Sequence, residues 1–533
     1  MLAGLQLQHL RRDFISGITV GIVAIPLGMA FAMASGVKPE YGIYTTIIAG
    51  LIVSLLGGSR FQIAGPTGAF IPILLAVVLQ YGYENLLIAG FMAGTFLVLM
   101  SFLRIGNLVH YIPRSVTIGF TTGIAVIIFT GQLGNLFGLN GMAQKQYFHE
   151  NMLEFFQHLP TLNLYSLGIA SIGIVSIVLI PKIAPRVPVL LVALLLPTFV
   201  SILFFPSQLD TIGTVFGGIS QSLPTFHLPN ITWTKINQLW GPAFAIASLG
   251  AIESLLSAVV ADGMTKEKHH SNRELFGQGI ANMITPLFGG IPATGAIART
   301  ATNIKSGAAT RLSGVIHSIF VLLTLLLFAP YASHIPLAAM APILMYVAWN
   351  MSQIKTFKAL LKRKNSDSLV LVVTFLLTVF VNLTVAIPIG LLLAVLSFVK
   401  KKSELLQLQQ EESFQQKSLD DNWSIHYKIF TIKGPLFFGT AQTFEQAIAH
   451  KLAGNPKTLI IDMTDVSLID ATGEEKFTIF VTTAQQNGYT ILIAGLPNWG
   501  IELFQQSGLF DQLGMDAFFS DVDHAKQVVL EAS

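Results

Sequence analysis

Ala64-Gly65-Pro66-Thr67-Gly68 and Pro292-Ala293-Thr294-Gly295 are the two stretches that decide the fold of this chain. Both lie in apolar segments, at about residues 63–80 and 293–308, that are crowded with Gly, Pro and Thr. A broken helix at membrane depth is tolerated only where its backbone is buried in protein or lines a cavity. The two stretches therefore predict a pair of interrupted membrane spans inside a helical membrane protein.

The composition excludes a purely soluble protein. Only 11% of the 533 residues are charged and 52% are apolar, whereas a soluble domain carries roughly 25% charged residues. The absence of cysteine excludes disulfides and thiolate metal sites. The net charge of +3 is too small to indicate a nucleic-acid partner.

The charged residues divide the chain into two parts. Residues 1–399 contain 21 basic and 11 acidic residues, about 8%, and residues 400–533 contain 10 and 17, about 20%. We predict a transmembrane domain over residues 1–402, a Gln/Glu-rich linker over 403–422 and a small soluble domain over 423–533.

Fourteen membrane spans are predicted, since about 17 to 25 apolar residues cross a bilayer as a helix. Residues 368–399 contain Pro388 and are counted as two spans, and the two interrupted segments are counted as one each. The other ten predicted spans are residues 17–36, 41–56, 84–103, 115–137, 163–181, 187–205, 241–261, 271–288, 312–332 and 337–351.

The basic residues orient these spans. With the N-terminus inside, twenty Lys and Arg residues fall on the cytoplasmic side and three on the opposite side, as the positive-inside rule requires. The start of the chain shows no cleavage site of a signal peptide. We expect a multi-pass protein of the cell (inner or plasma) membrane, with both termini in the cytoplasm.

An internal repeat relates the two interrupted segments. Leu56-Gly57-Gly58 precedes the first and Phe288-Gly289-Gly290 precedes the second, and the same alignment places Pro26 opposite Glu253. Halves of seven spans each have opposite orientations in the membrane. Inverted repeats with broken helices at corresponding places indicate a secondary transporter.

Two charged residues are predicted to lie deep within spans, namely Glu253 and Arg299. Buried charges are costly and are candidate functional residues. Arg299 follows the second interruption by about one helical turn, so its guanidinium and the helix N-termini predict an anion site. The alternative is that Arg299 only pairs with Glu253 to close the bundle.

Glu253 is a candidate for cation coupling. Ser254 and Ser257 lie on the same helix as Glu253, and its carboxylate and the hydroxyls could hold Na⁺. A carboxyl group in a low dielectric could equally carry a proton. The alternative is a structural glutamate. His317, in the span 312–332, is interpreted as a hydrogen-bonded core residue.

Residues 423–533 predict a small α/β domain, because strand and helix patterns alternate along them. Strands are expected at 423–438, 458–462 and 489–494, and helices at 474–486, 499–506 and 524–530. Thr472 would lie at a helix N-terminus, where it either contributes to the cap or accepts a regulatory phosphate.

These motifs resemble the SulP family of inorganic anion and sulfate transporters over nearly the whole chain. The resemblance rests on residues 64–68, on Glu253-Ser254-Leu255-Leu256-Ser257, on Gly295-Ala296-Ile297-Ala298-Arg299-Thr300 and on Asp470-Ala471-Thr472-Gly473. It implies two inverted seven-span repeats that form core and gate subdomains, a cytoplasmic STAS domain, movement of the core against the gate like an elevator, and a homodimer.

The resemblance also implies site residues. The anion would lie against Thr67, Gly68, Ala298 and Arg299, and Glu253 would couple transport to a cation, with Ser257 and Thr67 as its Na⁺ neighbours. STAS proteins that regulate sigma factors have two serines between Asp and Gly, whereas Ala471 and Thr472 stand here. Only Thr472 could therefore carry a phosphate and control a cytoplasmic protein partner.

The favoured function is symport of sulfate, bicarbonate or a dicarboxylate with H⁺ or Na⁺, without any other cofactor. The alternatives are a nucleobase:proton symporter of the same fold, an anion channel or exchanger, and a membrane-tethered signalling protein. Arg299 and the STAS domain argue against the nucleobase symporter. The sequence gives no indication of an enzyme, because it shows neither a nucleophile and base at a usable spacing nor a P-loop.

Overall fold

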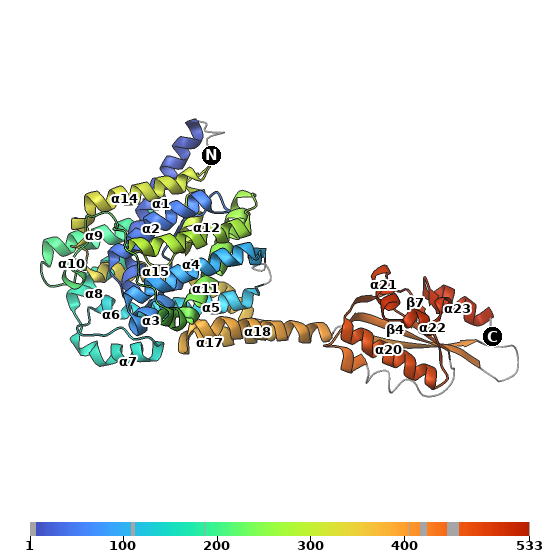
Figure 1. The fold of residues 1–533 in the computed structure, drawn as a ribbon. Helices are drawn as coiled ribbons and strands as arrows, with labels where there is room; N and C mark the ends of the chain where they lie inside the picture. The colour runs from blue at the N-terminus through green and yellow to red at the C-terminus, as the bar shows by residue number, and fades with distance from the viewer. Residues whose placement is uncertain are drawn as a thin grey trace. The chain divides into compact units, whose positions relative to one another are not determined.

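The computed structural model describes residues 7–107, 112–185, 187–404, 406–415, 424–444 and 458–531. The chain divides into two compact units, Met1–Leu392 and Leu393–Ser533 (Figure 1). Residues 416–422 of the predicted linker, and Trp423 at the start of the predicted STAS domain, lie outside the described ranges.

The first unit is helical. Its first half contains α1 (Leu7–Ala34), α2 (Pro39–Leu56), η1 (Gly68–Phe70), α3 (Ile71–Tyr81), α4 (Tyr83–Phe102), α5 (Arg114–Gly131), α6 (Leu133–Phe137), α7 (Phe148–His158), η3 (Leu159–Thr161), α8 (Leu164–Ile183), α9 (Val189–Phe204) and α10 (Ile212–Phe216). The following helices are α11 (Trp233–Thr265), α12 (Ser271–Ile284), η4 (Thr285–Phe288), α13 (Ile297–Lys305), α14 (Leu312–Ala332), α15 (Leu337–Met351), α16 (Ile354–Lys362) and α17 (Ser366–Phe380). Helix α18 (Leu383–Ser403) begins in the first unit and includes the boundary between the two units.

Many of these helices can cross a bilayer. Within the described ranges, nine helical segments are long and apolar enough to do so, and three shorter apolar helices cover residues 68–81, 189–204 and 366–380. The other two predicted spans, residues 271–288 and 293–308, contain α12 and α13. The prediction of a helical membrane protein is confirmed, and the number of fourteen crossings stays a prediction.

The two interrupted segments meet in the middle of the first unit. Strands β1 (Ala64–Gly65) and β2 (Thr294–Gly295) pair in antiparallel fashion, with Ala64 opposite Gly295. Helices η1 and α3 follow β1, and α13 follows β2, so both spans are interrupted as predicted. Ala64 of β1 packs in a cluster of small buried side chains, whose other members are Ala49, Val53, Ala281 and Ala293.

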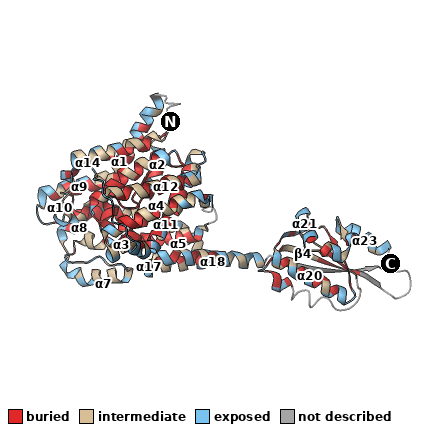
Figure 2. Cartoon of the chain, viewed as in Figure 1, coloured by how far each residue is buried: buried red, intermediate tan, exposed pale blue. Residues whose placement is uncertain are grey.

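Glycines allow close helix packing around this centre. A Cβ atom on Gly94 of α4 would lie only 2.6 Å from the carbonyl oxygen of Gly279 on α12. Close backbone contact of this kind is how small residues join helices in membranes. Figure 2 shows the buried residues gathered along α1, α4, α11 and α12.

The second unit is built on a mixed sheet. Its elements are β3 (Gln407–Gln415), β4 (Ser424–Leu436), β5 (Thr458–Asp462), β6 (Val466–Ile469), α20 (Ala471–Gln486), β7 (Thr490–Ala494), α21 (Asn498–Gln506), α22 (Leu509–Leu513), η5 (Met515–Ala517), β8 (Phe518–Phe519) and α23 (Val522–Glu531). The strand order is β3-β4-β5-β7-β8, with β6 beside β4. Apolar clusters around Phe477 and around Ile460 form its two cores.

The predicted linker is wrong over residues 407–415, because these residues form β3. Strand β3 pairs antiparallel with β4, whereas the other pairings in this sheet are parallel. Its Gln- and Glu-rich sequence has low strand propensity. Such a sequence fits an edge strand, where charged residues discourage pairing with another chain.

Candidate functional site

Arg299 lies at the point where the two interrupted spans meet. Its side chain extends from the first turn of α13 and is only 2% exposed. The Nη2 atom donates a hydrogen bond to the carbonyl oxygen of Pro66, 2.5 Å away. The Nη1 atom is buried and has no hydrogen-bond partner among the described residues. One edge of the guanidinium is thus anchored and the other retains free donors.

Gly65 makes room for this guanidinium. Its φ of +155° belongs to a region that other residues rarely adopt. A Cβ atom at this position would lie 2.6 Å from Nη1 of Arg299 and 3.1 Å from Nη2. The glycine of the first interruption is therefore required by the arginine of the second.

Glu253 joins the same centre through Thr67. Thr67 directly precedes η1, and its hydroxyl donates a hydrogen bond to Oε2 of Glu253 on α11 at 2.9 Å. Glu253 is half-buried and Thr67 is buried. Within the described ranges, Glu253 and Arg299 form no direct ion pair, so the alternative of a pair that closes the bundle is not what the structure shows.

The other predicted site residues differ in accessibility. Ala298 is exposed. Gly68 is buried, and a Cβ atom on it would lie 3.0 Å from Sδ of Met351. Ser257 is fully buried, and its hydroxyl donates to Oγ1 of Thr300 on α13, at 3.2 Å. The structure thus brings Thr67 to Glu253, while the recorded bond of Ser257 is to Thr300.

Side chains that the sequence analysis did not single out hold the backbone before β2. The amide of Asn282 donates to the carbonyl oxygen of Ala293 and accepts from its N–H, both at 2.8 Å. Oγ1 of Thr45 bonds both the N–H and the carbonyl group of Ile291. These bonds satisfy backbone groups that no helix or lipid could satisfy. The sequence signal that could have pointed to them is a polar side chain within an apolar predicted span.

Glu253 and Arg299 are not the only acidic or basic residues that the fold removes from solvent. Glu274 on α12 is also completely buried, and its carboxylate accepts hydrogen bonds from the N–H groups of Gly58 and Ser59 and from Gln278. These bonds fasten the chain just before the first interruption. Glu274 was overlooked because it lies near the start of its predicted span, where charges are common.

His317 is buried as predicted but is not hydrogen-bonded as predicted. It is 0% exposed on α14, and neither ring nitrogen has a partner among the described residues. Its Cδ2 atom lies close to Gly50 of α2, as does the carbonyl oxygen of Ala64 in β1. His317 therefore lies near Ala64 of the paired strands, on the side of α2.

In the second unit, Asp470 forms the cap that precedes Thr472. The Asp470 side chain accepts from the N–H of Gly473 at 2.8 Å and from that of Phe438 at 3.0 Å. Thr472 is the second residue of α20 and is half-buried. A phosphate in this first turn would face the positive end of the helix dipole.

The site as a whole favours an anion. The helices that follow β1 and β2 begin at the interruption without a side-chain cap, so the positive ends of their dipoles lie there. The guanidinium of Arg299 adds a cation with unused donors, and Glu253 provides a carboxylate that is held by Thr67 but does not neutralise Arg299 directly. A small anion and a cation could therefore be bound beside each other.

Comparison with known proteins agrees with this architecture. Residues 10–374 match the sulfate permease family, and residues 419–525 match the STAS domain. YvdB of Bacillus subtilis is 49% identical, with 98% of each chain covered. The bicarbonate transporter BicA of Picosynechococcus is 30% identical and covers 86% of this chain and 84% of its own.

The fold is also that of a solved structure. Murine Solute Carrier 26 family member A9, an anion transporter in the inward-facing state, superimposes with a TM-score of 0.85 at 20% identity, covering 98% of this chain and 92% of its own. The family consists of transporters and not of enzymes. The chain therefore belongs to the sulfate permease family and combines its helical membrane domain with a C-terminal STAS domain.

Proposed function

We propose that this protein is a secondary active transporter of a small anion such as sulfate, bicarbonate or a dicarboxylate. The observation that carries the proposal is the buried Nη1 of Arg299, which keeps free donors beside the N-termini that follow β1 and β2. The anion would contact Thr67, Gly68, Ala298 and Arg299. The similar proteins are named as transporters of bicarbonate or of anions, and this supports the proposed substrate class.

Glu253 is the proposed coupling residue, and H⁺ or Na⁺ is the proposed coupling ion. Its carboxylate and the Thr67 hydroxyl lie 2.9 Å apart, so a cation bound at Glu253 would disturb a residue at the anion site. Oxygen atoms of this kind suit Na⁺, with Ser257 as a further neighbour on α11, and a carboxyl group in a low dielectric suits a proton.

Transport would proceed by an elevator-type movement. Helix α1 packs with α2 and α14, whereas α8 packs with α9 and α15. The first group is joined to α13, since the Ser16 hydroxyl on α1 donates to the Asn303 carbonyl. These two groups correspond to the proposed core and gate. We further propose a homodimer with cytoplasmic termini, in which Thr472 of the STAS domain is open to regulation by a protein partner.

Uptake of radiolabelled anions into proteoliposomes tests this proposal. Sulfate, bicarbonate and a dicarboxylate would be offered with and without imposed Na⁺ and H⁺ gradients. We expect one of these anions to accumulate above its equilibrium level only with a gradient. Passive equilibration that no gradient affects would instead indicate a channel, and exchange that needs only an internal anion would indicate an exchanger.

Arg299 variants locate the site. Arg299→Ala should abolish uptake, and Arg299→Lys should restore it only partly, because lysine keeps the charge but loses the planar pair of donors. Thermal unfolding in detergent shows whether each variant is folded. Full uptake by folded Arg299→Ala protein would overturn the proposed site.

A further inference from the structure

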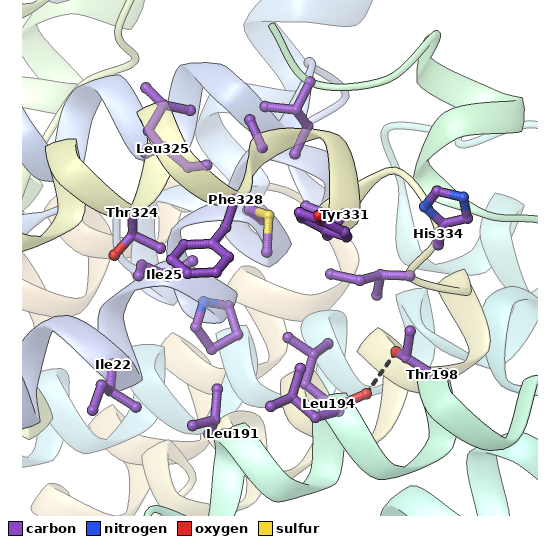
Figure 3. A pocket seen from close by; sticks show the side chains of 18 of the residues that line it. Ile22, Ile25, Leu191, Leu194, Thr198, Thr324, Leu325, Phe328, Tyr331 and His334 are labelled. Carbon is purple, nitrogen blue, oxygen red and sulfur yellow. Dashed lines mark hydrogen bonds between the residues drawn. The ribbon is translucent and has the colours of Figure 1, made fainter. Parts of the chain in front are cut away.

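A cavity whose lining does not include Arg299 lies between α1, α9 and α14. Its volume is about 630 Å³, within the range of about 300–1,000 Å³ that is usual for pockets of small molecules. Figure 3 shows Ile22 and Ile25 of α1, Leu191 and Leu194 of α9 and Phe328 of α14 around it. We call this cavity the α9–α14 crevice.

Apart from Tyr331 and His334 at one end, the described lining of the crevice offers a ligand no polar side chain with a free hydrogen-bonding group. Its lining, taken over the described residues, contains no Asp, Glu, Lys or Arg. The hydroxyl of Thr198 donates to the Leu194 carbonyl at 2.7 Å, and that of Thr324 donates to the Phe320 carbonyl at 2.9 Å. Both hydroxyls are thus used within their own helices. An anion or a chain of water molecules would gain nothing here.

The crevice continues into a surface that faces hydrocarbon. Leu195 and Phe199 on α9 are 53% and 61% exposed, and Phe328 on α14 is 55% exposed. Neighbouring residues that point away from the crevice, such as Leu196 and Leu327, are also exposed and apolar. Because α9 and α14 are apolar helices of a membrane domain, the medium around these side chains is the bilayer.

One end of the crevice is more polar than the rest. Tyr331 and His334 lie at the end of α14 and just beyond it (Figure 3). Aromatic residues with a polar tip are typical of the level of the lipid headgroups. The crevice therefore runs from an interfacial end into a purely apolar interior, which is the polarity of a single lipid.

We propose that the α9–α14 crevice binds one acyl chain of a bilayer lipid. The chain would pass the half-exposed Leu195 and Phe199 and pack against Ile22, Ile25 and Leu194. A lipid tail is as apolar as leucine, so the gain comes from close packing in a preformed space rather than from removal of water. An occupant of this kind is abundant and needs no specific headgroup.

The acyl chain would lie between two groups of helices, beside the direct contacts of α1 with α9 and α15. α1 and α14 pack against each other, and α9 packs against α8 and α15. If the first group moves past the second, the acyl chain must move or leave. A bound acyl chain would therefore change the rate of transport. This expected change in rate rests on the proposed transport function, whereas the binding of the acyl chain does not.

Photo-crosslinking tests the occupancy. The full-length protein is reconstituted in phosphatidylcholine vesicles that contain phosphatidylcholine with a diazirine midway along one acyl chain, and adducts are mapped by mass spectrometry. We expect adducts on the crevice residues of α9 and α14. Leu195→Trp, which fills the crevice, should lower them at least fivefold.

Leu196 provides the matched control. It is the next residue on α9 and is similarly exposed, at 44%, but does not line the crevice. Leu196→Trp should leave the crevice adducts unchanged. Equal labelling of both faces of α9, or labelling that Leu195→Trp does not lower, would overturn the proposal. The proposal would also be overturned if the crevice of the wild-type protein were not labelled and Leu195→Trp lowered the fraction of dimer. That result would indicate that a second copy of the protein occupies the crevice.

Anion uptake by the same vesicles separates the two proposals. A changed uptake rate in Leu195→Trp but not in Leu196→Trp, at unchanged anion affinity, would support the effect on turnover. If the wild-type protein takes up anions but shows no crosslinks in the crevice, only the lipid site would be refuted. Specific crosslinks in a protein that transports no anion would refute only the transport function.

Discussion

The hydroxyl of Thr67 donates a hydrogen bond to Oε2 of Glu253 at 2.9 Å. Thr67 precedes the helix that follows the first interruption, and Glu253 lies in α11, so the bond connects the proposed anion site to the proposed coupling residue. A change of charge at Glu253 would alter the position of Thr67.

Thr67→Val should weaken the coupling of anion uptake to a gradient. Valine keeps the shape of threonine but leaves the Glu253 carboxylate without this donor. We expect anion accumulation driven by the Na⁺ or H⁺ gradient to fall about tenfold, which corresponds to about 1.4 kcal/mol. Thr67→Ser, which retains the hydroxyl, should remain coupled. Equal coupling in both variants would show that the bond has no such role.

Glu253→Gln should remove the dependence on a cation gradient altogether. Glutamine can still accept a bond from Thr67, but it neither holds Na⁺ as a carboxylate does nor takes up a proton. Uptake should then only equilibrate the anion across the vesicle membrane. Continued accumulation against a concentration gradient by the folded variant would contradict the coupling role.

Gly65→Ala should inactivate transport, because a methyl group would displace the guanidinium of Arg299. The backbone strain alone should cost about 1–3 kcal/mol of stability. Gly82→Ala is the control, since Gly82 also has a positive φ, of +84°, but a Cβ there would meet nothing within 4 Å. Thermal unfolding should therefore be affected in both variants and anion uptake only in Gly65→Ala. Similar uptake losses in the two would argue against the contact.

Asn282→Leu should destabilise the membrane domain strongly. It leaves the buried N–H and carbonyl groups of Ala293 unpaired, and each unpaired group costs about 1–3 kcal/mol. The same substitution at the exposed Asn230 should have little effect. The melting temperature in detergent checks this prediction, and similar temperatures for the two variants would refute it.

Asp470→Ala should loosen the start of α20, because Asp470 caps this helix. Loss of such a cap costs about 0.5–2 kcal/mol. Hydrogen exchange of the full-length protein, followed by mass spectrometry, should show faster exchange in residues 471–475. Thr472→Ala should leave exchange there nearly unchanged, and a larger effect of Thr472→Ala would show that threonine is the main cap.

Much of the architecture was predictable because it depends on local physical rules. A low density of charge marks the part of the chain that faces lipid, and Gly and Pro within an apolar segment mark interruptions. The strands at 458–462 and 490–494 follow from runs of apolar β-formers. Strand β3 was missed because its polar residues do not form such a pattern, and only its pairing with β4 makes it a strand.

The site was predictable in its types of residue but not in its contacts. The sequence by itself determined that Arg299 and Glu253 would be charged residues in apolar spans, where an unused charge is too costly to retain. Only the tertiary structure decided that Arg299 bonds Pro66 against Gly65, that Glu253 bonds Thr67 instead of Arg299, and that Glu274 is buried. These contacts join residues about 190 to 230 positions apart in the sequence. The periodicity of one helix shows which residues share a face, but not which distant residue packs against that face.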